Sequence, residues 1–265
     1  MRGRHPGQGA ARARHPAQGA ARARRWPVIL ALLLVAGACD VSRPEVLPPP
    51  PDTGPPPVYV SVGASETTGA GSDQPLRDGW PRVLHRTALS PGAIHVNMGI
   101  PGATVAQALA EEVPTTLDAR PHLVTVWLNV NDITRGVDVA TYEAQLESLV
   151  RQVRRSARTR VLVANTPPLD QLPAYQLGRL LADVPAPEDV QALVAQYNEA
   201  IARVVKRQGA FLVDLHAVGM AARAAGTEAS FISRDGFHPS TAGHARVAEA
   251  FAEVLKASGP LVVNG

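Results

Sequence analysis

An alternation of short strands with longer helices is the feature of this sequence that most restricts its fold. Apolar and β-branched runs predict strands at residues 58–62, 93–96, 122–128, 161–164 and 211–214. Helical periodicity covers residues 80–88, 105–112, 140–156, 187–206 and 242–256. Because parallel strands need crossover connections, this order predicts a parallel sheet with helices on both faces. We therefore expect one three-layer α/β/α domain over residues 57–258, followed by a tail over residues 259–265.

Three candidate site residues follow predicted strands. Ser65, Gly102 and Asn131 each come just past a strand, and ligands of parallel α/β sheets bind beyond the carboxyl ends of the strands. The segment 167–187 is long for a connection in a compact domain, and such segments are often functional. We expect a binding site at this edge of the sheet, with residues 167–187 forming part of its rim.

An acid and an imidazole stand three residues apart near the C-terminus, at Asp235 and His238, and Pro239 follows directly. Ester hydrolysis needs a nucleophile, a base that takes its proton, and a group that orients the base. Ser65 is the candidate nucleophile and His238 the general base that later acts as an acid. Asp235 would hold the imidazole in the correct tautomer and stabilise the imidazolium.

The same edge of the predicted sheet offers donors for a developing oxyanion. The candidates are the backbone N–H groups of Ser65 and Gly102 and the side-chain amide of Asn131. Gly102 suits this role because no Cβ would block the approach of a substrate. The alternative for Ser65 and Asn131 is that they only form turns after strands.

Four blocks that contain these positions resemble the SGNH, or GDSL-type, hydrolases, a superfamily of esterases, lipases, thioesterases and carbohydrate deacetylases. The blocks are Gly63–Gly69 for Gly-Asp-Ser, Asn97–Thr104 for the Asn and Gly-rich turn, Asn129–Asp132 for Gly-x-Asn-Asp, and Asp235–Pro239 for Asp-x-x-His-Pro. Gln196–Ala200 also resembles a stretch that is common before the last strand of these proteins. The resemblance covers about residues 57–257, and it is specific because the four blocks occur in the family's order.

The resemblance implies a flavodoxin-like domain and a serine esterase that forms an acyl-enzyme without a metal or cofactor. It suggests a lysophospholipase-like or short-acyl esterase that acts on a small-molecule, lipid or glycan ester. One alternative is a carbohydrate O-deacetylase that acts on envelope polysaccharide. Another is a catalytically inactive binding module of the same fold. The sequence indicates no particular oligomeric state.

Two residues depart from the family's pattern. Ala64 stands where the family usually has an aspartate beside the nucleophile, and Asn129 stands where the third block usually has a glycine. Neither residue is a candidate nucleophile, base or oxyanion donor. Each could still change the geometry of its loop and lower activity.

The first 39 residues have the layout of an export signal. An arginine-rich stretch precedes the apolar run Val28–Ala38, which ends in small residues before Cys39, the single cysteine. This run of about eleven residues is shorter than the ~20 needed to span a bilayer. Ala36–Cys39 resembles a bacterial lipobox, although Leu or Val is usual at the position of Ala36. We expect an extracytoplasmic lipoprotein anchored to a membrane through Cys39, with simple secretion, periplasmic location or a retained membrane anchor as alternatives.

Two low-complexity segments flank this signal. A ten-residue repeat covers residues 4–23, and it is either an extended n-region or lies upstream of the true start codon. Residues 40–56 are proline-rich and predict a semi-rigid spacer between the anchor and the domain.

The positive charge of the chain is concentrated at its N-terminus. Seven of the 26 Lys and Arg residues lie within residues 1–25, where there is no acid, so residues 26–265 carry 19 basic and 23 acidic side chains. A nucleic-acid surface needs a dense basic patch, which this mildly acidic remainder does not supply. The histidines at 85, 95, 122, 216 and 244 have no metal-ligand spacing and are interpreted as surface or packing residues.

Overall fold

One sheet of parallel strands organises the domain. The structure is a computed structural model that describes residues 55–154, 158–182 and 184–261. Its strands are β1 (Val58–Gly63), β2 (Ile94–Asn97), β3 (Leu123–Trp127), β4 (Arg160–Ala164) and β5 (Phe211–Val213). They lie in the order β2-β1-β3-β4-β5 with every neighbouring pair parallel, which is the flavodoxin-like order. The predicted three-layer fold is confirmed.

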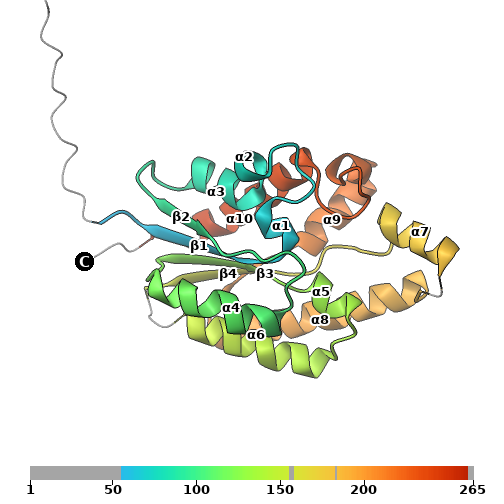
Figure 1. Cartoon of the computed structure of the whole chain (residues 1–265), viewed down its shortest axis with the longest axis horizontal. Helices are drawn as coiled ribbons and strands as arrows, with labels where there is room; N and C mark the ends of the chain where they lie inside the picture. Colours follow the sequence, from blue (N-terminus) through green and yellow to red (C-terminus); the bar gives the residue numbers. More distant parts are fainter. Residues whose placement is uncertain (1–54, 155–157, 183, 262–265) are drawn as a thin grey trace, which may run out of the picture. The chain divides into compact units, whose positions relative to one another are not determined.

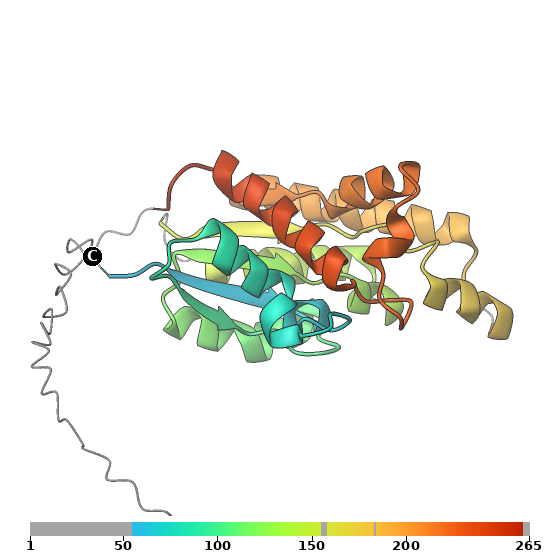
Figure 2. The same cartoon turned by 90° about the horizontal axis from the view of Figure 1, so that it is seen from above.

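Helices cover both faces of this sheet (Figures 1 and 2). One face carries α4 (Val105–Asp118), α6 (Val139–Val153) and α8 (Pro187–Gln208). The other carries α3 (Trp80–Ala88), α9 (Leu215–Ala224) and α10 (Thr241–Ala257). The connections hold α1 (Ser65–Thr68), α2 (Pro75–Asp78), α5 (Val130–Thr134), α7 (Pro173–Leu181) and the 3-10 helix η1 (Glu228–Phe231).

Side chains of the central strands alternate between two hydrophobic cores. Val60 and Val62 of β1 pack with the cluster that includes α4, α6 and α8. Tyr59 of β1 and Leu123 of β3 pack on the opposite face, together with residues of α3 and α10. All four side chains are essentially inaccessible to solvent. Burial on both faces fixes the sheet, so the loops at its carboxyl edge start from defined positions.

The expected strands and main helices agree with the structure to within a few residues, with three exceptions. Helix α4 continues through Pro114 to Asp118, well beyond the predicted end at residue 112. The predicted loop 167–187 contains α7, which has prolines near both ends and Gly178 inside it, the composition of a loop. Helix α9 was not predicted either; it too has an internal glycine, Gly219, and a single buried residue, Leu215.

The predicted signal, repeat and most of the spacer, together with Cys39, lie outside the described residues. The tail at residues 259–265 is described only as far as residue 261. Within the described part of the chain, no helix is both long enough and apolar enough to cross a bilayer.

Candidate active site

The structure brings together the predicted nucleophile, base and orienting acid, which come from opposite ends of the domain sequence. His238 Nε2 lies 2.9 Å from Ser65 Oγ, and His238 Nδ1 lies 2.6 Å from Asp235 Oδ2. An ionised carboxylate can only accept, so Nδ1 carries the hydrogen, Nε2 is the acceptor and the Ser65 hydroxyl donates. This polarity is the one that base-assisted attack by a serine requires.

Asp235 is held by bonds within its own turn. Its Oδ1 accepts from Ser233 Oγ at 2.7 Å, from Phe237 N at 2.8 Å and from His238 N at 2.9 Å. Gly236 has a φ of +74°, the left-handed conformation that closes the turn. Partial burial opposes ionisation of Asp235, but hydrogen bonds from His238, Ser233 and the backbone outweigh it and hold its pKa well below the ordinary value. Asp235 therefore stays charged at neutral pH.

Ser65 is held by partners that are distant in sequence. It is the first residue of α1 and follows the end of β1 after one intervening residue, Ala64. Glu112 of α4 accepts from Gly63 N at 2.8 Å, so a helix on one face of the sheet fixes the end of β1. Asn97 donates from Nδ2 to Thr67 O at 2.7 Å, which ties the turn after β2 to α1. The position of the nucleophile thus depends on two other elements.

Glu112 is a fully buried acid beneath this turn. Burial raises its pKa to about 8, although the bond from Gly63 N opposes the rise. Its other oxygen, Oε1, has no hydrogen-bond partner among the described residues. A protonated carboxyl therefore supports the strand end at neutral pH, a role that sequence reasoning did not assign.

The loop after α1 packs directly against the histidine. Gly71 has a φ of +92°, and a Cβ at this position would lie 2.7 Å from His238 Cβ and 2.4 Å from Pro239 O. The buried His244 of α10 accepts from Trp80 N at 3.2 Å through Nδ1, and its Nε2 donates to Ala70 O at 2.9 Å. His244 is therefore a structural residue, as predicted, and it helps to hold the loop that contacts His238.

Two of the predicted oxyanion donors, Gly102 and Asn131, lie on neighbouring segments that are linked by a hydrogen bond. Gly102 has a φ of +80°, so its backbone favours glycine independently of any substrate, and Arg135 Nη2 donates to its carbonyl at 2.8 Å. Asn131 Nδ2 donates to Ala103 O at 3.0 Å, which uses one of the two N–H groups of that amide. Asp132 accepts from Val105 N with both oxygens at 3.2 Å, and burial raises its pKa to about 6. The oxyanion role of Ser65, Gly102 and Asn131 stays a prediction.

Neither departure from the family's pattern lies at a left-handed backbone position. Ala64 is buried, with a φ of −103°. Asn129 has a φ of −166°, so it does not adopt the left-handed conformation that favours glycine. Its Nδ2 donates to Ala164 O at 3.4 Å, while its Oδ1 has no partner within the described residues.

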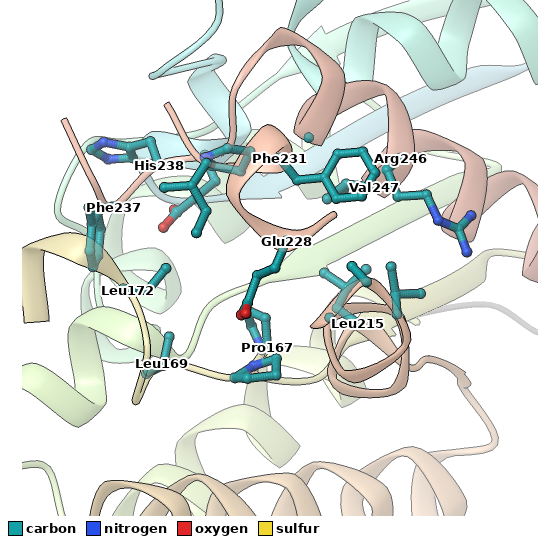
Figure 3. Close-up of a pocket in the computed structure, with 18 of the residues that line it drawn as sticks. Pro167, Leu169, Leu172, Leu215, Glu228, Phe231, Phe237, His238, Arg246 and Val247 are labelled. Carbon is teal, nitrogen blue, oxygen red and sulfur yellow. The ribbon is translucent and has the colours of Figure 1, made fainter. Parts of the chain in front are cut away.

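An apolar cavity lies beside the histidine (Figure 3). It has about 800 Å³ of empty space, its open mouth included. The walls come from the end of β3, the loop after β4, and from α9, η1 and α10, as Trp127, Leu169, Leu215, Phe231 and Val247 show. The predicted rim at residues 167–187 contributes Pro167, Pro168, Leu169 and Leu172. The site thus combines a polar reacting centre with an adjacent space for an apolar group.

Two further residues near this site were not assigned a role from sequence. Glu66, directly after the nucleophile, is 7% exposed and also lines the cavity. Asn198 of α8, within the Gln196–Ala200 stretch, accepts from Thr166 N at 2.8 Å and donates to Thr166 O at 3.0 Å. No local signal in the sequence distinguished Glu66, because an acid beside a turn is usually exposed.

Comparison with known proteins identifies the family and the fold of the chain. The sequence profile of the GDSL-like Lipase/Acylhydrolase family matches residues 61–246. The lipase/acylhydrolase from Enterococcus faecalis is 21% identical, with a TM-score of 0.60, and the match covers 79% of this chain and 99% of that one. A psychrotrophic esterase from Pseudoalteromonas sp. is 18% identical, with a TM-score of 0.56 and coverages of 76% and 97%. The family 3 carbohydrate esterase of Clostridium thermocellum is 20% identical, with a TM-score of 0.56 and coverages of 76% and 96%.

These solved structures share the fold, and the profile match defines the class of protein. No curated protein matches the chain by sequence. The chain belongs to the GDSL-like lipase/acylhydrolase family and is a carboxylic ester hydrolase.

Proposed function

We propose that this protein is a serine esterase in which Ser65, His238 and Asp235 carry out hydrolysis through an acyl-enzyme. The observation that carries the proposal is the continuous hydrogen-bond chain from Ser65 Oγ through His238 to Asp235. Its polarity leaves the serine as donor and the imidazole as acceptor, as the first step requires.

In that step Ser65 Oγ attacks the carbonyl carbon of the ester while His238 Nε2 takes the hydroxyl proton. The tetrahedral oxyanion is stabilised by the N–H groups of Ser65 and Gly102 and by the second N–H of Asn131. As the first residue of α1, Ser65 has no acceptor for its N–H inside that helix. The C–O bond to the alcohol then breaks and His238 returns the proton to the leaving oxygen. Water, activated by the same imidazole, hydrolyses the acyl-enzyme and restores Ser65.

The apolar cavity supports an ester with an apolar group, such as a short acyl ester or a lysophospholipid-like ester, over an acetyl group on a polysaccharide. Its walls next to His238 are mainly aliphatic and aromatic, and burial of apolar surface there would favour binding by ~25 cal/mol per Å². The alternative function is deacetylation of a polysaccharide. A deacetylase would hydrolyse acetyl esters but not esters with longer acyl chains.

The test is hydrolysis of p-nitrophenyl acetate, butyrate and longer esters by the purified full chain, with Ser65→Ala as the control. We expect turnover by the wild type, a loss of several orders of magnitude in the variant, and fluorophosphonate labelling at Ser65 alone. Absence of both hydrolysis and labelling would leave the inactive binding module as the correct description.

The proposed location is an extracytoplasmic membrane surface, reached through a lipid on Cys39. It is supported by the order of arginine-rich region, apolar run, small residues and cysteine in the sequence. Mass spectrometry of the mature protein should find an acylated Cys39 as its first residue. An unmodified N-terminus at another residue would exclude the anchor and leave secretion.

A further inference from the structure

Glu66 is a buried carboxyl beside the nucleophile that the proposed reaction does not use. Its Oε2 lies 3.5 Å from Ser65 Oγ, and only 7% of the residue is exposed. It lines the apolar cavity together with His238. The other acid of that cavity, Glu228, is neutralised by Arg223 at 2.9 Å, whereas no ion pair of the described residues includes Glu66. A carboxyl without an ion-pair partner in the wall of an apolar cavity is favourable only if it forms a hydrogen bond, which a bound substrate could supply.

The Ser65 hydroxyl leaves Glu66 without a hydrogen-bond donor from the nucleophile. The single hydrogen of the Ser65 hydroxyl is directed to His238 Nε2 at 2.9 Å. Burial raises the pKa of Glu66, although its own backbone N–H and the nearby His238 oppose the rise. A carboxyl accepts from a hydroxyl group in either of its forms, and its protonated form also donates, so a hydroxyl group is a suitable partner for Glu66.

The position of Glu66 restricts which part of a substrate it can reach. A carbonyl carbon poised for attack lies roughly 3 Å from the serine oxygen. Atoms three or four bonds from that carbon can then come within hydrogen-bonding reach of Glu66, which is 3.5 Å from the same oxygen. An apolar group at that place would remove water from the carboxyl and return no hydrogen bond, which is unfavourable. A hydroxyl group there would pair with it.

We infer that Glu66 recognises a hydroxyl group within two carbons of the ester, so that the preferred substrates are hydroxylated esters and not plain aliphatic ones. The inference rests on the proposed function and names a substrate class for the same site. The hydroxyl can stand on the alcohol side, as in a glycerol monoester or a sugar ester, or on the acyl side, as in a 3-hydroxyacyl ester. Glu66 acts here as a specificity residue, while Ser65 and His238 carry the reaction.

Two pairs of isosteric esters test this inference on the full chain. On the alcohol side, 2-hydroxyethyl butanoate is compared with propyl butanoate, and on the acyl side, p-nitrophenyl 3-hydroxybutanoate with p-nitrophenyl 3-methylbutanoate. Each kcat/KM is divided by the ester's rate constant for hydroxide hydrolysis. We expect a preference of roughly 10- to 100-fold for the hydroxylated ester in one pair, which identifies the side that Glu66 contacts.

Three variants separate recognition from a structural role. Glu66→Leu should reduce the preferred ratio to near one, while Glu66→Gln, which keeps a donor and an acceptor, should retain most of it. Glu228→Gln alters the other acid of the cavity and should leave the ratio unchanged. Should Glu66→Leu not fold, Glu66→Met serves in its place.

A ratio near one in both pairs for the wild type, or a ratio that Glu66→Leu leaves intact, would overturn the inference. Propyl butanoate and the 3-methylbutanoate ester lack the hydroxyl group, so their hydrolysis tests the proposed esterase activity independently of recognition by Glu66. If these plain esters are hydrolysed in a Ser65-dependent way, the esterase assignment stands and only the recognition by Glu66 is wrong. If no ester is hydrolysed, the proposed function itself is wrong.

Discussion

The two turns that meet at the candidate site are held in different ways. In the turn that carries His238, the four hydrogen bonds accepted by Asp235 come from donors within three residues. In the turn that carries Ser65, the local bonds of α1 are joined by bonds to Glu112 and Asn97, which are 49 and 30 residues from their partners Gly63 and Thr67. The base is therefore oriented by local geometry, whereas the nucleophile is positioned by the packing of the whole domain. Damage to the two turns should have different consequences.

The largest effect on kcat is expected from Asp235→Asn, which replaces the carboxylate at the centre of the turn that carries His238. The amide can still accept through its oxygen, but its N–H₂ group would face His238 Nδ1 and favour the tautomer with the hydrogen on Nε2. That tautomer cannot take the proton of Ser65, so kcat should fall by about 10⁴-fold. Because Asp235 is half-exposed and its donors are local, the thermal unfolding midpoint should change little. A fall of less than tenfold in kcat would remove Asp235 from the mechanism.

The other turn should respond to Glu112→Leu in both activity and stability. Loss of the acceptor leaves Gly63 N buried without a partner, which costs about 1–3 kcal/mol of unfolding free energy. The end of β1 carries Ser65, and a displacement of about 1 Å at a reacting group can cost about 10²-fold in rate. Urea unfolding and kcat measurements on the same preparation check both effects. Glu112→Gln, which keeps an acceptor for Gly63 N, is the matched control and should be close to the wild type at pH 7.

The same difference explains how much could be predicted from the sequence. Asp235, His238 and Pro239 form a motif whose contacts lie within a few residues, so its geometry could be expected from spacing. Glu112 stands at the end of a predicted helix, and nothing near it in sequence indicates that it reaches Gly63. That contact exists only once α4 packs on β1. Local patterns therefore predicted the strands and the His-bearing turn, but not the support beneath the nucleophile.

Local sequence patterns also failed to predict helix α7 and the cavity, which form the rim of the site. The segment 167–187 contains prolines and a glycine, which favour a loop, yet α7 forms and its first turn bonds to the His-bearing turn through Ala174 N and Gly236 O at 3.1 Å. The cavity assembles Leu169, Leu215 and Val247 from three separate elements. Each is an ordinary apolar residue in its own segment, so no local pattern distinguishes the lining of the cavity from the core.

The pH dependence of stability should also distinguish the turn that carries Ser65 from the turn that carries His238. The pKa of Glu112, which supports the first turn, is raised, whereas the pKa of Asp235 in the second turn is lowered. The pKa of Glu112 is raised to about 8 by burial, so the folded state binds its proton more tightly than the unfolded state. Its contribution to stability is complete below the unfolded pKa of ~4.3 and is lost as pH rises towards 8. The unfolding free energy of the wild type should therefore fall relative to that of Glu112→Gln by about 1 kcal/mol between pH 6 and pH 7. Parallel urea titrations measure this difference, and parallel profiles for the two proteins would contradict it.

The smallest effect is expected when one of several local donors is removed with Ser233→Ala. Asp235 Oδ1 would lose the bond from Ser233 Oγ and keep those from Phe237 N and His238 N. A single net hydrogen bond is worth about 1 kcal/mol, and water can reach this half-exposed carboxylate, so kcat should fall by only about two- to fivefold. Ser258→Ala at the end of α10 removes a similar hydroxyl bond far from the site and should leave kcat unchanged. A loss of kcat near 10²-fold in Ser233→Ala would contradict this expectation. It would show that the remaining donors to Asp235 cannot replace Ser233, so that the turn that carries His238 depends on each of its local hydrogen bonds.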